Sequence, residues 1–197
     1  MALARKGANT RANIIEHAKQ LFYQRGYDGT SFTDIVQATG LHRGNIYHYF
    51  KTKDEILQAV IDSRLAEFSA LLDAWERERI DPRGRILALV EMVTGRNADL
   101  VRYGCPIGSL NIELGKDRLE MQTAARSLFE LFRRWLARRF EELGQGERSD
   151  ALALHLLGRA QGIAVISHVY RDAELLRSET AVLADWVQGI GDPADGD

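Results

Sequence analysis

The chain has 197 residues, of which 45% are hydrophobic and 27% are charged. This balance excludes intrinsic disorder over most of the length and leaves room for one large domain, or for a small domain followed by a medium one. The single cysteine excludes an internal disulfide and a multi-cysteine metal site. No run approaches the roughly 18 consecutive apolar residues of a membrane span, and the N-terminal segment lacks the apolar core of a secretory signal. We therefore expect a cytoplasmic protein without a membrane partner.

The net charge of −2 is distributed unevenly along the chain. Up to Lys53 the sequence has eight Lys and Arg residues against three acidic ones, and the remainder has 18 basic and 25 acidic residues. A basic N-terminal segment followed by an acidic remainder is typical of a protein that presents one end to a polyanion.

Apolar residues recur at helical spacing through almost the whole chain, and no alternating stretch is long enough to predict a sheet. Two capping-box patterns, Ser31 to Asp34 and Thr52 to Glu55, mark helix starts, and Gly26 marks a helix end. The sequence predicts helices over 10–25, 31–38 and 42–50, from Thr52 with an apolar stripe to Trp75, over 82–102 and 109–114, from Asp117 to Leu143, from Ser149 to about Arg171, and from Ser178 to about Ile190.

The predicted helix over residues 152–170 is apolar on nearly all sides. A helix of this kind is buried on two sides, either within its own chain or against another subunit. The two interpretations, a central core helix and a dimer interface, are compatible and both stay open. The candidate interface residues on this helix and the next one are Gly158, Gly162, Ile166, Val182 and Trp186.

The two short predicted helices, 31–38 and 42–50, form a helix-turn-helix pattern with Thr39-Gly40-Leu41 as the turn. In such a motif the second helix enters the major groove with its N-terminal residues at the base edges. Arg43 suits guanine and Asn45 suits adenine, while hydroxyl and ammonium groups nearby suit phosphate. The candidate DNA-contacting residues are Thr30, Ser31, Thr33, His42, Arg43, Gly44, Asn45, Tyr47, His48, Tyr49, Lys51 and Lys53.

About a quarter of the chain, from Ile14 to Val60, closely resembles the TetR family of transcriptional repressors, in order and without gaps. His42 departs from the pattern, because the family usually has Ser or Thr as the cap of the second motif helix. The matching residues are Ile14, Ile15, Ala18, Leu21, Phe22, Gly26, Tyr27, Thr30, Ser31, Asp34, Ile35, Ala38, Gly40, Leu41, Gly44, Ile46, Tyr47, Tyr49, Phe50, Lys53, Asp54, Glu55 and Leu57.

The resemblance implies an all-α homodimer with an N-terminal three-helix DNA-binding domain, residues 1–52, and a helical ligand-binding and dimerisation core, residues 53–190. Residues 191–197 are expected to be a disordered tail. A two-fold dimer in which each subunit reads one half-site implies double-stranded DNA with a palindromic operator. The resemblance also implies a small-molecule effector that releases the repressor from DNA.

The effector site is predicted less sharply, because aromatic and sulfur-containing residues are more often core than pocket. His155 and His168 are about 20 Å apart along one predicted helix, so they cannot share a metal within one subunit. We expect neither a metal nor a cofactor. The candidate pocket residues are Met92, Tyr103, Cys105, Phe129, Phe132 and His168.

Cys105 lies in a Gly-Cys-x-x-Gly-x-Leu segment, just before a predicted helix start where the helix dipole favours a thiolate. The segment resembles the NemR-like, electrophile-sensing subgroup of the family, in which the cysteine is the sensor. Two features depart from it: no lysine follows Lys116, and the subunit has no second cysteine. Two interpretations stay open, an inert small residue at a helix break and a reactive sensor.

Other function classes explain less of the sequence. An enzyme or a small-molecule carrier built on a helical bundle has no motif in its favour and leaves the basic N-terminal segment unexplained. An architectural DNA-binding protein would not need so large a second domain. The sequence leaves repressor and activator roles open, and we predict a ligand-responsive repressor that is not an enzyme.

Overall fold

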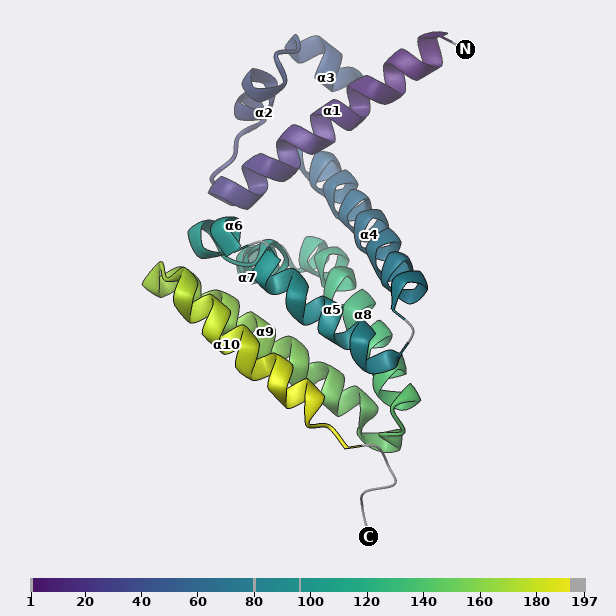
Figure 1. Ribbon diagram of the computed structural model, residues 1–197. Coiled ribbons are helices and arrows are strands. Elements are labelled where there is room, and N and C mark those ends of the chain that lie inside the picture. The colour runs from purple at the N-terminus through teal and green to yellow at the C-terminus, as the bar shows by residue number, and fades with distance from the viewer. Residues whose placement is uncertain (1, 80, 96, 192–197) are drawn as a thin grey trace. The chain divides into compact units, whose positions relative to one another are not determined.

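The computed structural model describes residues 2–79, 81–95 and 97–191, and every regular element among these residues is helical (Figure 1). The prediction of an all-α fold is therefore confirmed. The helices are α1 (Ala2–Arg25), α2 (Phe32–Thr39), α3 (Arg43–Tyr49), α4 (Lys53–Glu78), α5 (Pro82–Gly95), α6 (Asn97–Tyr103), α7 (Pro106–Asp117), α8 (Leu119–Glu142), α9 (Ser149–Tyr170) and α10 (Ala173–Gln188), with a short 3₁₀ turn at Gly146–Arg148.

The chain forms two compact units. The first unit contains the residues up to Glu67 together with Ser109–Leu128, and the second contains Phe68–Gly108 and the residues from Phe129 onward. The first unit therefore extends beyond the expected domain of residues 1–52. The physical reason is that the first turns of α4 bury their apolar side chains in the same core as α1 to α3, as the N-terminal part of α8 also does. The main members of that core are Ile14, Ala18, Tyr27, Ile35, Ile46, Ile56, Leu57, Ile61, Leu114 and Ala125.

The ends of the short helices are where local sequence signals predict them. The side chain of Ser31 accepts a hydrogen bond from the backbone N–H of Asp34, and the Asp34 carboxylate accepts one from the Ser31 backbone at 2.7 Å. The hydrogen bond from the Ser31 hydroxyl also lowers the pKa of Asp34. Gly40 ends α2 in the left-handed conformation with φ 66°, which a residue with a Cβ adopts only at a cost.

Several helix boundaries differ from the sequence prediction. Helix α1 begins at Ala2, well before residue 10, and the predicted helix over 82–102 is described as α5 and α6, with residue 96 outside the described residues. Helix α7 begins at Pro106 and not at Ser109, because proline is well suited to the first helical position. Asp117 ends α7 and does not cap α8, which begins at Leu119.

The last helix begins earlier than predicted. Asp172, and not Ser178, is its N-cap, and the Asp172 side chain accepts hydrogen bonds from the backbone of Glu174 and Leu175. Ser178 lies one turn inside the helix and donates to the Leu175 carbonyl at 3.1 Å. A serine therefore does not mark a start when an aspartate upstream already satisfies the N–H groups of the first turn.

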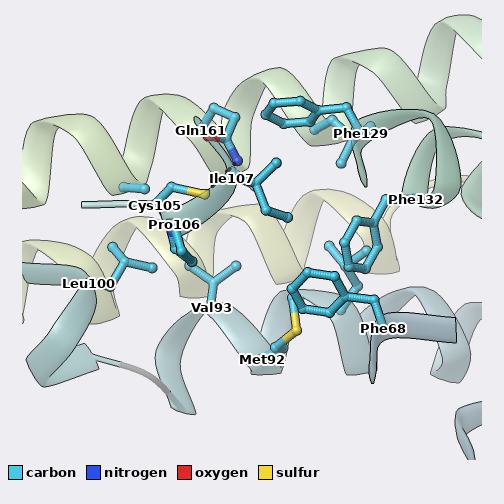
Figure 2. Close-up of a pocket in the computed structure, with 14 residues that line it drawn as sticks. Phe68, Met92, Val93, Leu100, Cys105, Pro106, Ile107, Phe129, Phe132 and Gln161 are labelled. Atoms are coloured by element: carbon cyan, nitrogen blue, oxygen red, sulfur yellow. Dashed lines mark hydrogen bonds between the residues drawn. The ribbon is translucent and has the colours of Figure 1, made fainter. Parts of the chain in front are cut away.

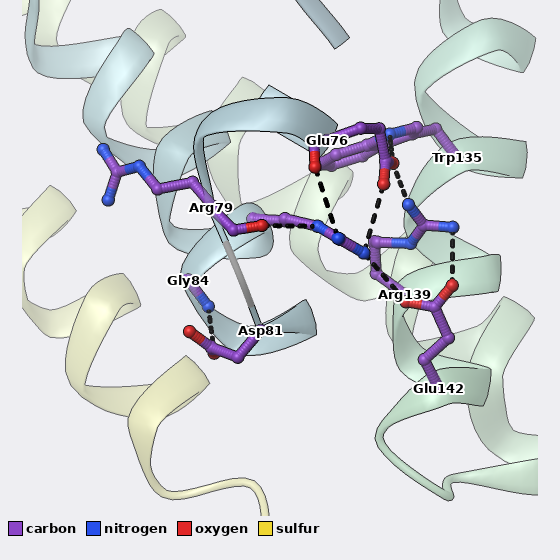
Figure 3. Close-up of polar contacts among 8 residues, drawn as sticks. Glu76, Arg79, Asp81, Gly84, Trp135, Arg139 and Glu142 are labelled. Carbon is purple, nitrogen blue, oxygen red and sulfur yellow. Dashed lines mark hydrogen bonds and ion pairs between the residues drawn. The ribbon is translucent and has the colours of Figure 1, made fainter. Parts of the chain in front are cut away.

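In the second unit, a polar network connects the end of α4 to α5 and α8 (Figure 3). Glu76 accepts a hydrogen bond from Trp135 Nε1 at 2.6 Å and from Arg139, and it pairs with Arg85 at 3.1 Å. Arg139 also pairs with Glu142 at 2.8 Å. Arg139 is nearly buried, with 9% of its side chain exposed, whereas Glu76 and Glu142 stay partly exposed. The network therefore holds the C-terminal end of α4 firmly in this unit.

Helix α9 packs against α10 and α6 and keeps a second apolar face exposed. The segment Gly146–Tyr170 is long and apolar enough to cross a membrane by length and composition alone, and one third of its most apolar window is buried. An interface helix of a helical dimer meets the same description. The predicted disordered tail falls largely on residues 192–197, which lie outside the described residues.

Candidate functional site

The helix-turn-helix is built by α2 and α3, which bury one side and expose the other. Ile35 and Ile46 are fully buried, and Phe50 is nearly so, which orients α3 on α1 and α4. The opposite side of α3 presents its polar residues to solvent. The exposed candidate DNA contacts are Ser31, Thr33, His42, Arg43, Gly44, Asn45, Tyr47, His48 and Lys51, and Tyr49 is half-buried.

Arg43, at the first position of α3, is held by two aromatic rings. Its guanidinium carbon lies 5.7 Å from the Phe32 ring centroid and 5.4 Å from that of Tyr47, and Nη2 donates to the Tyr47 hydroxyl at 3.1 Å. The two rings stack on each other with centroids 4.7 Å apart. The arrangement orders a long, exposed side chain, and an ordered side chain loses less conformational entropy when it binds a partner.

His42 occupies the N-cap of α3 without a side-chain cap. Its backbone is extended and its carbonyl accepts from Asn45 at 2.9 Å, but its imidazole makes no hydrogen bond to the first turn. The departure from the family pattern at this position therefore leaves the first N–H groups of α3 open to another acceptor. A DNA phosphate is an acceptor of the right charge for a helix N-terminus.

Two of the candidate DNA contacts point inward. Thr30 is fully buried, and its hydroxyl donates to the Gly26 carbonyl at 2.7 Å, which places it out of reach of a phosphate. The Lys53 ammonium donates to the carbonyls of Tyr27 at 2.7 Å and Thr30 at 2.9 Å, and lies 3.9 Å from the Tyr27 ring centroid. Burial lowers the pKa of Lys53. Lys53 therefore ties the start of α4 to the loop before α2.

We expect Lys53→Ala to lower the free energy of unfolding by about 1.5–3 kcal/mol, because two carbonyls of buried residues lose a charged donor. Lys51 is the matched control, since it is exposed and its ammonium donates only to the nearby Tyr47 carbonyl. Lys51→Ala should leave stability unchanged and lower the salt dependence of DNA binding by about one phosphate contact. Urea unfolding measures the stability of both variants, and salt titrations measure the salt dependence of their DNA binding. Equal stability of the two variants would contradict the assignment.

The second unit contains an apolar cavity of about 70 Å³ (Figure 2). Four of the predicted pocket residues, Met92, Cys105, Phe129 and Phe132, line it. The other two do not: His168 is hydrogen-bonded to the Val101 carbonyl at 3.1 Å, and the Tyr103 ring lies under the Arg102 guanidinium. The remaining lining residues are Phe68, Leu89, Val93, Leu100, Pro106, Ile107, Leu157, Ala160, Gln161 and Ala164.

Of the described residues that line the cavity, Cys105 and Gln161 carry its polar side-chain groups. The Cys105 sulfur accepts from the Gln161 side-chain amide at 3.4 Å, and Figure 2 shows these two side chains beside each other. The sulfur also accepts from the Gly108 backbone N–H at 3.4 Å. Cys105 directly precedes α7, so the positive end of that helix also faces the sulfur. The sequence prediction missed Gln161 and Phe68, because nothing in their local patterns distinguishes them from other helix residues.

The predicted dimer residues on α9 lie along a groove beside α10. Gly158, Gly162 and Ile166 line this groove, and Val182 on α10 is 52% exposed. Trp186 instead packs within the subunit, with its ring 4.8 Å from that of His155 and 6.4 Å from that of Phe140. A Cβ at either glycine would meet nothing within 4 Å, so the space beside them is free in one subunit.

Among the described residues, no three His, Cys, Asp or Glu side chains are grouped to hold a metal ion. The described residues instead form a helix-turn-helix whose second helix exposes Arg43 and its neighbouring polar residues, and separately an apolar cavity. These features define a helix-turn-helix DNA-binding protein.

Comparison with known proteins agrees. Residues 14–60 match the family model described as "Bacterial regulatory proteins, tetR family". An uncharacterized HTH-type transcriptional regulator of Lactococcus lactis subsp. lactis is 28% identical over 93% of this chain and 96% of its own length. A TetR transcriptional regulator from Chloroflexus aurantiacus has the same fold, with a TM-score of 0.82, 24% identity, and coverage of 94% of this chain and 97% of its own. The reduced form of E. coli NemR matches with a TM-score of 0.78 and 20% identity over 94% of this chain and 99% of its own.

Residues 14–60 therefore match the TetR family model, and the chain as a whole is similar to HTH-type transcriptional regulators. The prediction that it is not an enzyme is confirmed by the same relatives.

Proposed function

We propose that the protein is a cytoplasmic homodimeric repressor that binds a palindromic operator through α3 and is released by a small apolar or electrophilic effector. The observation that carries the dimer is the apolar face that α9 and α10 leave exposed in one subunit. A contiguous apolar surface of this kind marks an interface. Its large exposed side chains are Leu154, Val165, Ile166, Val169, Tyr170 and Val182.

The two-fold symmetry of the proposed dimer predicts the symmetry of the operator sequence. In a closed dimer each subunit presents the same α3 residues, so the DNA sequence reads as an inverted repeat with half-sites about one helical turn apart or a multiple of it. Selection from random DNA with the full-length protein tests this directly, together with light scattering for the subunit count. An enriched inverted repeat and a dimer mass support the proposal. A single non-repeated site bound by a monomer would overturn it.

The lining of the cavity supports a small uncharged compound as the effector. Among the residues that the structure describes, no Lys, Arg, Asp or Glu lines it, and a charged ligand buried there would lack a counter-ion. Its volume of about 70 Å³ is below the roughly 150 Å³ of an engineered cavity that holds benzene. A short unsaturated aldehyde is of suitable size, and the Cys105 sulfur lies in the cavity wall to react with it.

The reaction at Cys105 balances without an oxidant. The sulfur attacks the β-carbon of the unsaturated carbonyl, an S–C bond forms, the C=C π bond breaks, and the thiol proton ends on the α-carbon. The adduct occupies space that the lining side chains fill in the free protein. It therefore favours a conformation with a larger cavity, and it releases DNA to the extent that this conformation binds the operator less well.

We expect complete alkylation of Cys105 by acrolein to weaken operator binding roughly 5- to 150-fold, the usual range of allosteric coupling. Mass spectrometry verifies the labelling, and fluorescence anisotropy with the selected operator measures affinity. Cys105→Ser is the matched control, which should bind DNA normally and ignore acrolein. Unchanged affinity of fully labelled protein would remove the electrophile from the proposal and leave a non-covalent ligand in the cavity.

A further inference from the structure

Helix α7 makes two kinds of contact at its two ends. Its first residues, Pro106 and Ile107, line the cavity beside Cys105. Its third turn carries Glu113, about 9 Å further along the helix axis at 1.5 Å per residue. Nothing in the local sequence marks Glu113 as a functional residue.

The Glu113 carboxylate binds the loop between α1 and α2 with both oxygens. Oε2 accepts from the Tyr27 backbone N–H at 2.9 Å, and Oε1 accepts from the Asp28 backbone N–H at 2.8 Å. Gly26 makes the approach possible: it has φ 79°, and a Cβ there would lie 2.9–3.2 Å from the carboxylate. A bidentate carboxylate on two N–H groups is a strong contact with narrow geometric tolerance.

The loop that Glu113 holds is firmly connected to the recognition motif. Lys53 joins the carbonyls of Tyr27 and Thr30, and the capping box of α2 begins at the next residue. The Tyr27 side chain is buried, and its hydroxyl donates to Asp54. Arg118, just beyond α7, lies over the Tyr27 ring at 5.0 Å and pairs with Asp28 at 3.5 Å. A displacement of the loop therefore displaces the start of α2.

We propose that Glu113 is the positioning residue through which α7 couples the cavity to the DNA-binding helices. This inference rests on the proposed function, because it takes the cavity as the effector site. Helix shifts in switching proteins are about 1–2 Å, whereas a hydrogen bond is lost within a few tenths of an ångström beyond its range. An occupant that moves the first turn of α7 by such a distance breaks both Glu113 contacts and frees the loop.

Amide hydrogen exchange measures the contact without an operator. The probe is N-ethylmaleimide, which labels the protein at one site because Cys105 is its single cysteine. The resulting adduct is larger than benzene, which binds in an engineered cavity of roughly 150 Å³. The adduct therefore does not fit the cavity beside Cys105 unless the lining side chains move apart. We expect labelling of the full-length protein to speed exchange of the Tyr27 and Asp28 amides at least about tenfold.

Glu113→Gln separates a coupling role from a purely structural one. The amide keeps the shape but turns an N–H₂ toward one of the two donors, so these amides should exchange fast before labelling. Labelling should then add less than about twofold, and the operator affinities of labelled and unlabelled variant should agree within the same factor. Glu120→Gln is the control: the residue is exposed in the first turn of α8 and loses the same charge. It should respond to labelling as the wild type does.

The outcomes separate this inference from the proposed function. If labelling leaves exchange at Tyr27 and Asp28 unchanged, or if Glu113→Gln keeps the full response of exchange to labelling, the coupling role of Glu113 is overturned. If exchange rises in the wild type, and not in Glu113→Gln, while operator affinity stays constant, Glu113 couples the cavity to the loop and the proposed release mechanism fails.

Discussion

Gly162→Leu is expected to convert the protein into a stable monomer that binds its operator roughly 100-fold more weakly, because avidity between two half-sites is lost. Gly162 lies inside α9 with ordinary helical backbone, and a Cβ at this position meets nothing within 4 Å in the subunit. A Cβ therefore causes no clash within the subunit, and the open groove that Gly162 lines leaves room for the rest of a leucine side chain. The substitution also raises helix propensity by up to about 1 kcal/mol. A bulky side chain in the groove interferes only with a second subunit.

This substitution separates folding from assembly. Thermal unfolding should show that the variant is folded and stable. Sedimentation velocity should show that it is a monomer. Gly162→Ala is the matched control, since it gains the same propensity without the bulk and should stay dimeric. A Gly162→Leu protein that remains a full-strength dimer would remove Gly162 from the interface and point to the outer residues of α9, such as Val169 and Tyr170.

Arg43→Ala is expected to cost roughly 1–3 kcal/mol on the selected operator and to relax sequence preference at one base pair of each half-site. The reason is chemical: a guanidinium donates two parallel hydrogen bonds to guanine, and no other side chain at the start of α3 replaces them. In the unbound protein, Phe32 and Tyr47 already hold this side chain in place. The expected loss therefore includes the benefit of an ordered donor.

Two further variants test which property of Arg43 matters. Arg43→Lys keeps the charge but loses the planar fork, so it should bind all DNA sequences with near-normal salt dependence and reduced preference. Tyr47→Phe removes the hydroxyl that accepts from Arg43 Nη2 and should have a smaller effect of the same kind. Affinities are measured on the operator and on single-base variants at fixed salt. If Arg43→Ala weakens binding to every sequence equally, Arg43 is a phosphate contact and not a base reader.

Local sequence signals were enough wherever a helix end depends on its own neighbours. The capping box at Ser31 and Asp34 and the glycine at Gly40 are within one turn of the feature that they determine. The signals failed where two candidate caps compete. Asp172 precedes Ser178 and satisfies the first N–H groups of α10. The signals also failed at the end of α9, where Arg171 adopts φ 55° without the glycine that usually marks such an end.

Residue chemistry alone did not decide which side chains face a partner. Thr30 and Lys53 have the hydroxyl and ammonium groups of a phosphate contact, and both are engaged by buried backbone carbonyls in the first unit. Asn45 and Arg43 carry groups of the same polarity, and they face solvent because Ile46 on the other side of α3 is buried. Helical periodicity separates these two sets only after the core partner of each helix is known.

The sequence by itself determined the helical fold, the helix-turn-helix and the resemblance of residues 14–60 to a known family, because each depends on contiguous patterns of spacing and capping. Only the tertiary structure decided the cavity and the contacts of Glu113. The cavity gathers Phe68, Met92, Cys105, Phe132 and Gln161 from distant parts of the chain. Glu113 acts on backbone N–H groups more than 80 residues away in the chain. Contacts of this range have no sequence period, since they arise only when packed helices bring the two segments together.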